Sequence, residues 1–221
     1  MLILTVIIIL SYLVGSIPTS IIVSKLSRGI DIRDYGSGNA GGTNVMRVLG
    51  WKQGLFVIFL DAMKGVLAVV VIARLQDGSM PFTNLTPFDD FTLIQIIAGI
   101  SAVIGHIWTV FAGFKGGKGI ATALGMLLMI STIDMLIAIG IFVAVVGISR
   151  YVSLGSIVGA ISIPLILFVR ENIFNVNIPG YNTLLPFVIF LTLLVIFTHR
   201  KNVIRLLNGS EHKISFSKKK S

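Results

Sequence analysis

Long apolar runs alternate with short polar segments along the whole chain. Five of the runs cover residues 2–24, 55–73, 91–111, 154–169 and 182–197. A helix needs roughly 20 predominantly apolar residues to cross the hydrocarbon core of a bilayer, and these runs come close to that length. The pattern therefore predicts an all-α, polytopic membrane protein in which the polar segments form the loops.

A sixth apolar run, residues 120–148, is too long for one span. As a single helix it would measure about 44 Å at about 1.5 Å per residue, well beyond a hydrocarbon core of about 30 Å. The residues STID at 131–134 lie near its middle, where a carboxylate would be costly. We therefore expect two spans joined by an outside turn at residues 131–134, which brings the expected total to about seven.

The composition excludes a soluble domain. Of the 221 residues, 55% are hydrophobic and 12% are charged, and the mean hydropathy is +0.96. Cysteine is absent, so disulfides and thiolate metal sites are excluded. The length fits one membrane-integral domain over residues 1–221, with residues 215–221 expected to form a disordered basic tail.

The basic residues set the expected orientation. Seven spans place fifteen of the 18 lysines and arginines on one side, which the positive-inside rule assigns to the cytoplasm. The N-terminus is then outside and the C-terminus cytoplasmic, whereas six spans would send Lys218, Lys219 and Lys220 outside. The formal charge of +9 therefore reports cytoplasmic loops rather than a nucleic-acid surface.

The polar stretch at residues 35–49, YGSGNAGGTNVMRVL, holds four glycines between two apolar runs. Glycine lets a backbone turn with φ > 0 and lets a ligand approach main-chain N–H groups. The second half is compatible with a helix, whose N-terminal N–H groups would favour an anion, and Arg47 adds a planar donor suited to phosphate. The stretch indicates an interfacial or re-entrant anion site, and a flexible loop without a ligand is the alternative.

Part of this stretch also matches the dinucleotide-binding fingerprint. Gly36, Gly38 and Gly41 have its spacing, and Asp61 follows about twenty residues further on. That fingerprint requires a strand before the glycines and a βαβ unit around them. Because Asp61 falls inside an apolar span, we reject the match.

A second glycine-rich segment, FKGGKG at residues 114–119, precedes the fourth span. Lys115 and Lys118 flank Gly116 and Gly117 where the next helix is expected to begin. The paired glycines favour a second anion site. A positively charged membrane anchor with a tight turn is the alternative.

The P-loop pattern fails in this segment. Ala112 stands where the first glycine is needed, and Gly119 replaces the Ser or Thr that binds magnesium. We therefore expect anion binding without metal chemistry. His106, just upstream, is the kind of group that acts as a general base at neutral pH, although a hydrogen-bonded structural histidine is the alternative.

Other polar residues sit inside or beside the spans. Asp61 and Lys64 lie three apart on one helical face, either facing a cavity or pairing with each other to join helices. Ser153 opens the sixth span, where N-capping is the alternative to ligand binding. Asn202 and Arg205 share a face of a helix that follows the last span, which would let them reach one ligand.

Four motifs, in order, resemble the bacterial PlsY family of membrane acyl-phosphate:glycerol-3-phosphate acyltransferases. They are GSGNAGGTNVMR from residue 36, GH at 105–106 with FKGGKGIAT from 114, SLGS from 153, and HRKNVIRLLNGSE from 199. The resemblance covers nearly the whole chain, including the seven expected spans. Ala40, Gly42 and Thr109 depart from it, since the family often has Pro, Ala and Pro there.

The resemblance implies a fold, an activity and a location. A fatty acyl group passes from acyl phosphate to the sn-1 hydroxyl of glycerol 3-phosphate, giving lysophosphatidate and phosphate in phospholipid biosynthesis. No cofactor, metal or nucleic acid is implied. The expected partners are acyl phosphate, glycerol 3-phosphate, membrane lipid and an enzyme that makes acyl phosphate. The active site is expected on the cytoplasmic face of the bacterial inner membrane.

The resemblance also implies which residues form the site. The expected catalytic residues are Lys115, Lys118 and His106, with a lysine stabilising the carbonyl oxyanion and a substrate phosphate able to accept the hydroxyl proton. The expected substrate-binding residues are Ser37, Gly38, Asn39, Thr43, Asn44, Arg47, Gly116, Gly117, Ser153, His199, Asn202 and Arg205.

Two other classes of function compete with this interpretation. An anion transporter would bind phosphate at broken helices in mid-membrane, whereas the glycine motifs here lie at the ends of spans. A structural membrane scaffold would leave two basic, glycine-rich motifs without a purpose.

Overall fold

The computed structural model describes residues 1–76, 79–85, 88–178 and 180–214, and these ranges are helical without a β-strand. They group into two compact units, Met1–Thr132 and Ile133–Ser221, which are described here one at a time. The expected single domain stays a prediction, and the expected tail at residues 215–221 lies outside the described residues. The all-α, multi-pass prediction is confirmed.

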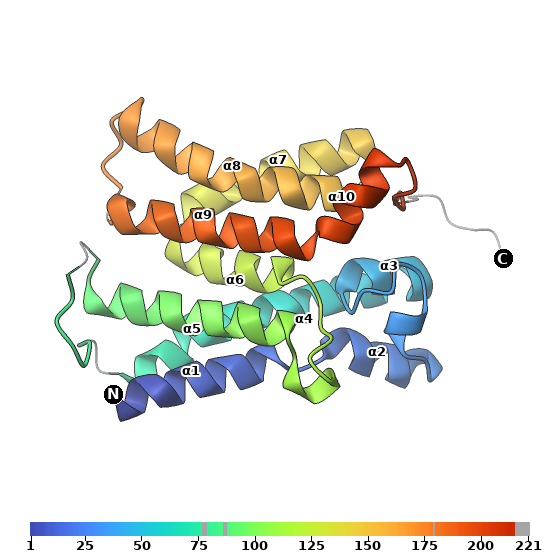
Figure 1. The fold of residues 1–221 in the computed structure, drawn as a ribbon, viewed down its shortest axis with the longest axis horizontal. Helices are drawn as coiled ribbons and strands as arrows, with labels where there is room; N and C mark the ends of the chain where they lie inside the picture. Colours follow the sequence, from blue (N-terminus) through green and yellow to red (C-terminus); the bar gives the residue numbers. More distant parts are fainter. Residues whose placement is uncertain (77–78, 86–87, 179, 215–221) are drawn as a thin grey trace. The chain divides into compact units, whose positions relative to one another are not determined.

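The described residues of the first unit form six helices, and three of the connections between them contain a short 3₁₀ turn (Figure 1). The helices are α1 (Leu2–Gly15), α2 (Thr19–Arg28), α3 (Gly42–Leu49), α4 (Trp51–Val70), α5 (Asp90–Ile107) and α6 (Ile120–Ile130), and the turns are η1 (Ile32–Asp34), η2 (Ile72–Leu75) and η3 (Val110–Ala112). The loop between α2 and α3 and the segment between α5 and α6 lie at the same end of this unit.

The second unit contains α7 (Thr132–Ser149), α8 (Val152–Asn172), α9 (Tyr181–Thr198) and α10 (Arg200–Leu207). Helices α8 and α9 pack against each other. Helix α10 is amphipathic and short, and His199 alone separates it from α9.

Among the described residues, six helical segments are long and apolar enough to cross a membrane, and α6 is a shorter apolar helix of 11 residues. The break expected in the run 120–148 is present, but it is confined to Ser131. Asp134 therefore does not lie in a connecting turn outside the helices, although the sequence predicts one there. It is buried in the first turn of α7, where Arg170 Nη1 donates to its Oδ1 at 2.6 Å. The count of seven spans stays a prediction.

The first span is interrupted, which the sequence prediction missed. Helix α1 ends at Gly15 and α2 begins only at Thr19. Pro18 explains the break, because proline has no N–H to donate into a helix and disfavours helical backbone at the residue before it. The interruption leaves backbone carbonyl groups that need donors from elsewhere.

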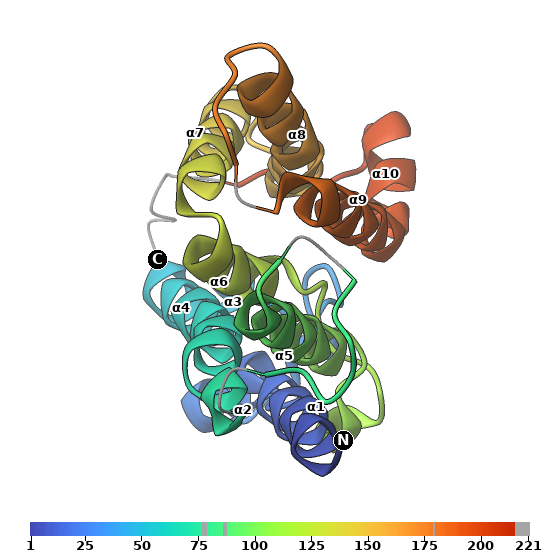
Figure 2. The same cartoon turned by 90° about the vertical axis from the view of Figure 1, so that its left-hand side faces the viewer.

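Helices α4 and α6 cross at two glycines and run beside α5 (Figure 2). A Cβ on Gly65 would lie 2.1 Å from the carbonyl oxygen of Thr122, and one on Gly125 would lie 2.0 Å from that of Ala62. The two backbones therefore touch directly, as small residues allow in membrane helices. This crossing fixes α4, which carries Asp61 and Lys64.

We expect Gly65→Ala to destabilise the protein by about 1–3 kcal/mol, the usual cost of forcing extra atoms into a packed contact. Gly140→Ala is the matched control, because that helical glycine has nothing within 4 Å of an added Cβ. Thermal unfolding of both variants in detergent measures the difference. Equal midpoints for the two variants would contradict the close crossing.

Candidate active site

The glycine-rich loop is organised from within by Asn44. This side chain is 1% exposed, and its Oδ1 accepts from the backbone N–H of Ser37 at 2.8 Å. Its Nδ2 donates to the carbonyl oxygens of Ile32, Tyr35 and Asn39 at 3.0, 2.9 and 3.1 Å. Because one buried amide makes all these bonds, Asn44 shapes the loop rather than facing outward from it.

Two of the glycines are required by backbone conformation. Gly36 and Gly38 have φ values of +61° and +72°, in the left-handed region that favours glycine. Helix α3 begins directly after the loop, with Thr43 in its first turn and Arg47 in its last. Arg47 and Ser37 are half-buried, as are Asn39 and Thr43, so these side chains lie nearer the surface than the buried Asn44.

The side chain of Arg33 links the glycine-rich loop to the second motif. Arg33 Nη2 donates to Asp31 Oδ2 at 2.7 Å, and Arg33 Nη1 donates to the carbonyl oxygen of Ala112 at 2.9 Å. The hydrogen bonds from Arg33 lower the pKa of Asp31 despite its partial burial. Since Ala112 lies just before residues 114–119, Arg33 holds the two glycine-rich segments together.

The second motif packs tightly on the end of α5. The backbone N–H groups of Gly116 and Gly117 donate to the carbonyl oxygens of Ile107 and His106 at 3.1 and 3.0 Å. A Cβ on Gly116 would lie 2.1 Å from the His106 oxygen, and one on Gly117 would lie 2.2 Å from His106 Nε2 and 2.8 Å from the Ala40 oxygen. These glycines are therefore needed for close approach, and their N–H groups already have partners.

The lysines of this motif are placed differently from the glycines. Lys115 is exposed and Lys118 is half-buried. Gly119, with φ of +80°, caps the N-terminus of α6. An anion at this motif would therefore meet lysine side chains and the first turn of α6.

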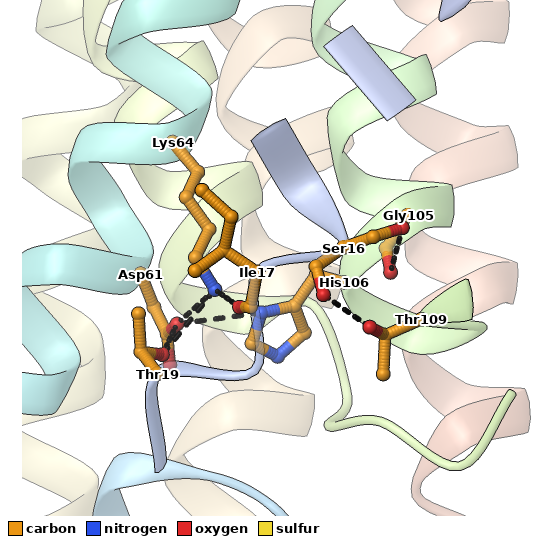
Figure 3. A network of polar contacts seen from close by, with 8 residues as sticks. All are labelled: Ser16, Ile17, Thr19, Asp61, Lys64, Gly105, His106 and Thr109. Carbon is orange, nitrogen blue, oxygen red and sulfur yellow. Dashed lines mark hydrogen bonds and ion pairs between the residues drawn. The ribbon is translucent and has the colours of Figure 1, made fainter. Parts of the chain in front are cut away.

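A buried polar cluster lies beneath the two motifs (Figure 3). Lys64 Nζ donates to Asp61 Oδ1 at 2.7 Å and to the carbonyl oxygen of Ile17, at the break in the first span, at 2.6 Å. The Thr19 hydroxyl donates to Asp61 Oδ1 and accepts from Lys64. Asp61 and Lys64 are 2% and 4% exposed, so the pair faces the interior of the unit, as expected.

His106 connects this cluster to the glycine motifs. Its Nδ1 lies 3.6 Å from Asp61 Oδ1, and the side chain is buried. A cavity of about 10 Å³ opens beside it, with room for roughly one water molecule. The cavity is lined by Ile17, Pro18, Thr19, Ser20, Ala40, Lys64, His106, Thr109, Gly116 and Gly117.

The rest of the break is joined to α5 and the segment after it. Thr109 donates its hydroxyl to the carbonyl oxygen of Ser16, and Ser16 Oγ donates to that of Gly105 at 3.2 Å. The Tyr12 hydroxyl donates to the carbonyl oxygen of Trp108 at 2.7 Å. Thr109, one of the departures from the family pattern, thus satisfies a carbonyl that the break has freed.

In the second unit, Glu211 gathers several of the predicted site residues. Asn202 Nδ2 donates to Glu211 Oε1 and Arg205 Nε donates to Glu211 Oε2, each at 2.9 Å. Burial alone would raise the pKa of Glu211, but hydrogen bonding from Arg205 and Asn202 outweighs burial and lowers it. His199 is buried, with its Nδ1 2.8 Å from the carbonyl oxygen of Val195.

Sequence reasoning missed two members of these groups. Thr19 carried no signal of its own, although Pro18 marked the break that places it. Glu211 had a stronger signal, because it is a lone carboxylate in a basic segment only nine and six residues from Asn202 and Arg205. The segment also folds back, with the N–H of Ile214 donating to the carbonyl oxygen of Arg150 at 2.9 Å.

The helices and the paired, basic glycine motifs define an integral membrane protein whose polar groups gather at one end of its first unit. A family model described as glycerol-3-phosphate acyltransferase matches residues 5–209. A protein of that name from Chlorobaculum tepidum is 48% identical over 96% of this chain and 97% of its own length. One from Chlorobium chlorochromatii is 46% identical over 99% of this chain and its full length.

The fold is also similar to solved crystal structures of PlsY (YgiH), described as an integral membrane glycerol 3-phosphate acyltransferase. The glycerol 3-phosphate form has a TM-score of 0.80 at 36% identity over 96% of both chains. The lysophosphatidic acid form has a TM-score of 0.77 at 36% identity. The chain belongs to the glycerol-3-phosphate acyltransferase family, and the resemblance to PlsY is confirmed.

We expect Glu211→Gln to lower the thermal unfolding midpoint most at neutral pH and progressively less in acid. Because the folded pKa of Glu211 is lowered, its stabilisation is present above the unfolded value, about 4.3. That stabilisation is lost as pH falls through the folded value. Melting curves from about pH 7 to about pH 3, a range that extends below the unfolded value, measure the gap to wild type. Asp34→Asn, which removes one exposed negative charge, is the control, and a gap independent of pH would contradict this role.

Proposed function

We propose that the protein transfers a fatty acyl group from acyl phosphate to the sn-1 hydroxyl of glycerol 3-phosphate, giving lysophosphatidate and phosphate. The observation that carries the proposal is the direct packing of the two glycine-rich motifs around Ala40 and Gly117, which sets two basic segments side by side. The reaction needs two phosphate-bearing substrates next to each other. The names of the relatives and the two ligand forms of PlsY support the acceptor and the product.

The chemistry suits a site rich in cations. An acyl phosphate is a mixed anhydride and is already activated. The hydroxyl oxygen attacks the acyl carbonyl carbon, the bond from that carbon to the phosphate oxygen breaks, and phosphate leaves. The protein has to align the two substrates and stabilise the developing oxyanion, and Lys115 or Lys118 supplies that charge.

Within the first unit, Arg47 holds a substrate phosphate with its planar fork. Ser37, Gly38, Asn39 and Thr43 contribute donors around it. Three other predicted residues are proposed to act indirectly. Asn44 acts by shaping the loop, and Gly116 and Gly117 act by letting the motifs approach each other.

Within the second unit, Ser153, His199, Asn202 and Arg205 are proposed to contact phosphate or glycerol groups. Glu211 holds both side chains in place, since it accepts from Asn202 Nδ2 and from Arg205 Nε. A guanidinium group carries five N–H donors, so Arg205 can bind Glu211 and a substrate oxygen at the same time.

A substrate phosphate is proposed to accept the hydroxyl proton. His106 is buried under the second motif, and its Nε2 is directed at Gly117 rather than at open space. That placement favours a supporting role. We place the site on the cytoplasmic face of the inner membrane, since the basic segments carry most of the cationic charge, with an acyl-phosphate-making enzyme as a partner.

We expect purified protein to form lysophosphatidate from palmitoyl phosphate and glycerol 3-phosphate without added metal. Product formation is followed by mass spectrometry, with palmitoyl-CoA as the alternative donor. The outcome that would defeat the proposal is robust transfer from palmitoyl-CoA and none from palmitoyl phosphate. Phosphate flux without acyl transfer would instead identify an anion transporter.

Arg47→Ala and Lys118→Ala should each reduce turnover about 10²- to 10³-fold, the usual effect of removing one charge-stabilising donor. His106→Ala should retain measurable turnover. Arg47→Lys should remain impaired if a planar fork is needed, while the exposed Lys52→Ala should be close to wild type. Each variant must first elute as a monodisperse protein. Background activity in well-folded His106→Ala beside a nearly normal Arg47→Ala would reverse these roles.

A further inference from the structure

The cluster of Thr19, Asp61 and Lys64 has no part in the mechanism above (Figure 3). Helix α4, which is long and apolar enough to cross a membrane, carries Asp61 and Lys64, and both side chains are almost fully buried. Ionisable groups in spans are costly and usually serve a function. A charged pair placed beside the glycine motifs therefore calls for an explanation.

A purely structural role accounts for only part of the cluster. Lys64 is a second donor to the carbonyl of Ile17, which also accepts from the N–H of Thr19 at 2.9 Å, and Asp61 balances the charge of Lys64. This structural role would not require Asp61 to lie close to His106 as well. Yet Asp61 Oδ1 also lies 3.6 Å from His106 Nδ1. Its two partners, Thr19 and Lys64, line the same cavity as His106, Gly116 and Gly117.

The position of Asp61 determines how the His106 ring is held. A nitrogen lone pair directed at a carboxylate oxygen would be repelled, so the proton of a neutral ring belongs on Nδ1. Nε2 then faces Gly117, whose added Cβ would lie 2.2 Å away. The carbonyl oxygen of the same histidine accepts from the N–H of Gly117 at 3.0 Å. The His106 ring therefore lies between the carboxylate of Asp61 and the second glycine-rich motif, and both restrict its orientation.

We propose that Thr19, Asp61 and Lys64 are positioning residues that act through His106 on the second glycine motif. The inference rests on the proposed function, because turnover is one of its measures. Thr19 and Lys64 fix Asp61 Oδ1, and Asp61 fixes the orientation and tautomer of the His106 ring. The ring and its carbonyl then hold the backbone between Lys115 and Lys118.

Thr19 offers the mildest test, because valine keeps its shape and removes only the hydroxyl. Thr19→Val should lower kcat about 10-fold, as expected for loss of one hydrogen bond to a charged group. Thr19→Ser, which restores the hydroxyl, should be close to wild type. Thr5→Val is the control, because the exposed Thr5 hydroxyl donates only within its own helix α1.

The same change in a His106→Ala background separates positioning from general stability. If Thr19 acts through the ring, Thr19→Val should cost less than about 2-fold there, because coupled residues are not additive. A full 10-fold loss in that background would show independent action and overturn the proposal. So would an unimpaired Thr19→Val, or a Thr19→Ser as impaired as Thr19→Val.

A spectroscopic measurement on the wild-type protein needs no substrate, and one folded variant serves only to assign the signal. The ¹⁵N shifts of the imidazole nitrogens report the tautomer, and the chain has only three histidines, so loss of one signal in His106→Ala gives the assignment. We expect the His106 proton on Nδ1, and a proton on Nε2 alone would overturn the proposal. Absence of acyl transfer together with a proton on Nδ1 would contradict the proposed function, but it would still support the positioning of the His106 ring by Asp61.

Discussion

A backbone carbonyl inside a membrane protein needs a hydrogen-bond donor, and the break in the first span deprives carbonyls of the donor that a continuous helix would supply. Pro18 makes the break unavoidable, since it has no N–H to continue the helix. Lys64 from α4 donates to Ile17, and Thr109 from the segment after α5 donates to Ser16. A buried lysine in turn needs a counter-charge, which Asp61 provides. The polar centre of the first unit thus follows from one interrupted helix.

The donors reach the break only because backbones approach closely around it. A Cβ on Gly105 would lie 2.2 Å from the carbonyl oxygen of Tyr12, so α1 and α5 touch at that point. Glycine serves two separate purposes in this unit. Gly36 supplies a left-handed turn, whereas Gly117 supplies room for His106. The sequence alone predicts that both glycines belong to anion sites, because residue type does not show whether a glycine serves a turn or a close contact.

Much of the fold could be predicted from the lengths of the apolar runs alone, because the thickness of the bilayer sets the length of a membrane span. The break near Ser131 was also predictable, since one helix of that run would be too long. Its extent was not, because the burial of Asp134 depends on a partner, Arg170, that lies 36 residues away. The break at Pro18 had a local signal, but the uniform hydrophobicity around it outweighed that signal in the prediction.

The candidate site was predictable in its parts and less so in its connections. Composition and spacing identified the glycines and cations of both motifs. Contacts between distant segments, such as His106 with Asp61 or Arg33 with Ala112, have no local pattern. They arise only when helices pack. For the same reason the pairing of Asp61 with a histidine was not foreseen, although each residue had been considered separately.

Two of the three asparagines predicted to bind substrate show why residue type alone does not assign a role. Asn44 and Asn202 are 1% and 3% exposed, and each directs its amide at its own chain. An amide both donates and accepts, so it suits a loop brace as well as a ligand contact. An ammonium or guanidinium group only donates and favours anions. The half-buried or exposed Arg47, Lys115 and Lys118 are therefore better placed to meet phosphate than Asn44, whose buried amide holds the backbone of its own loop.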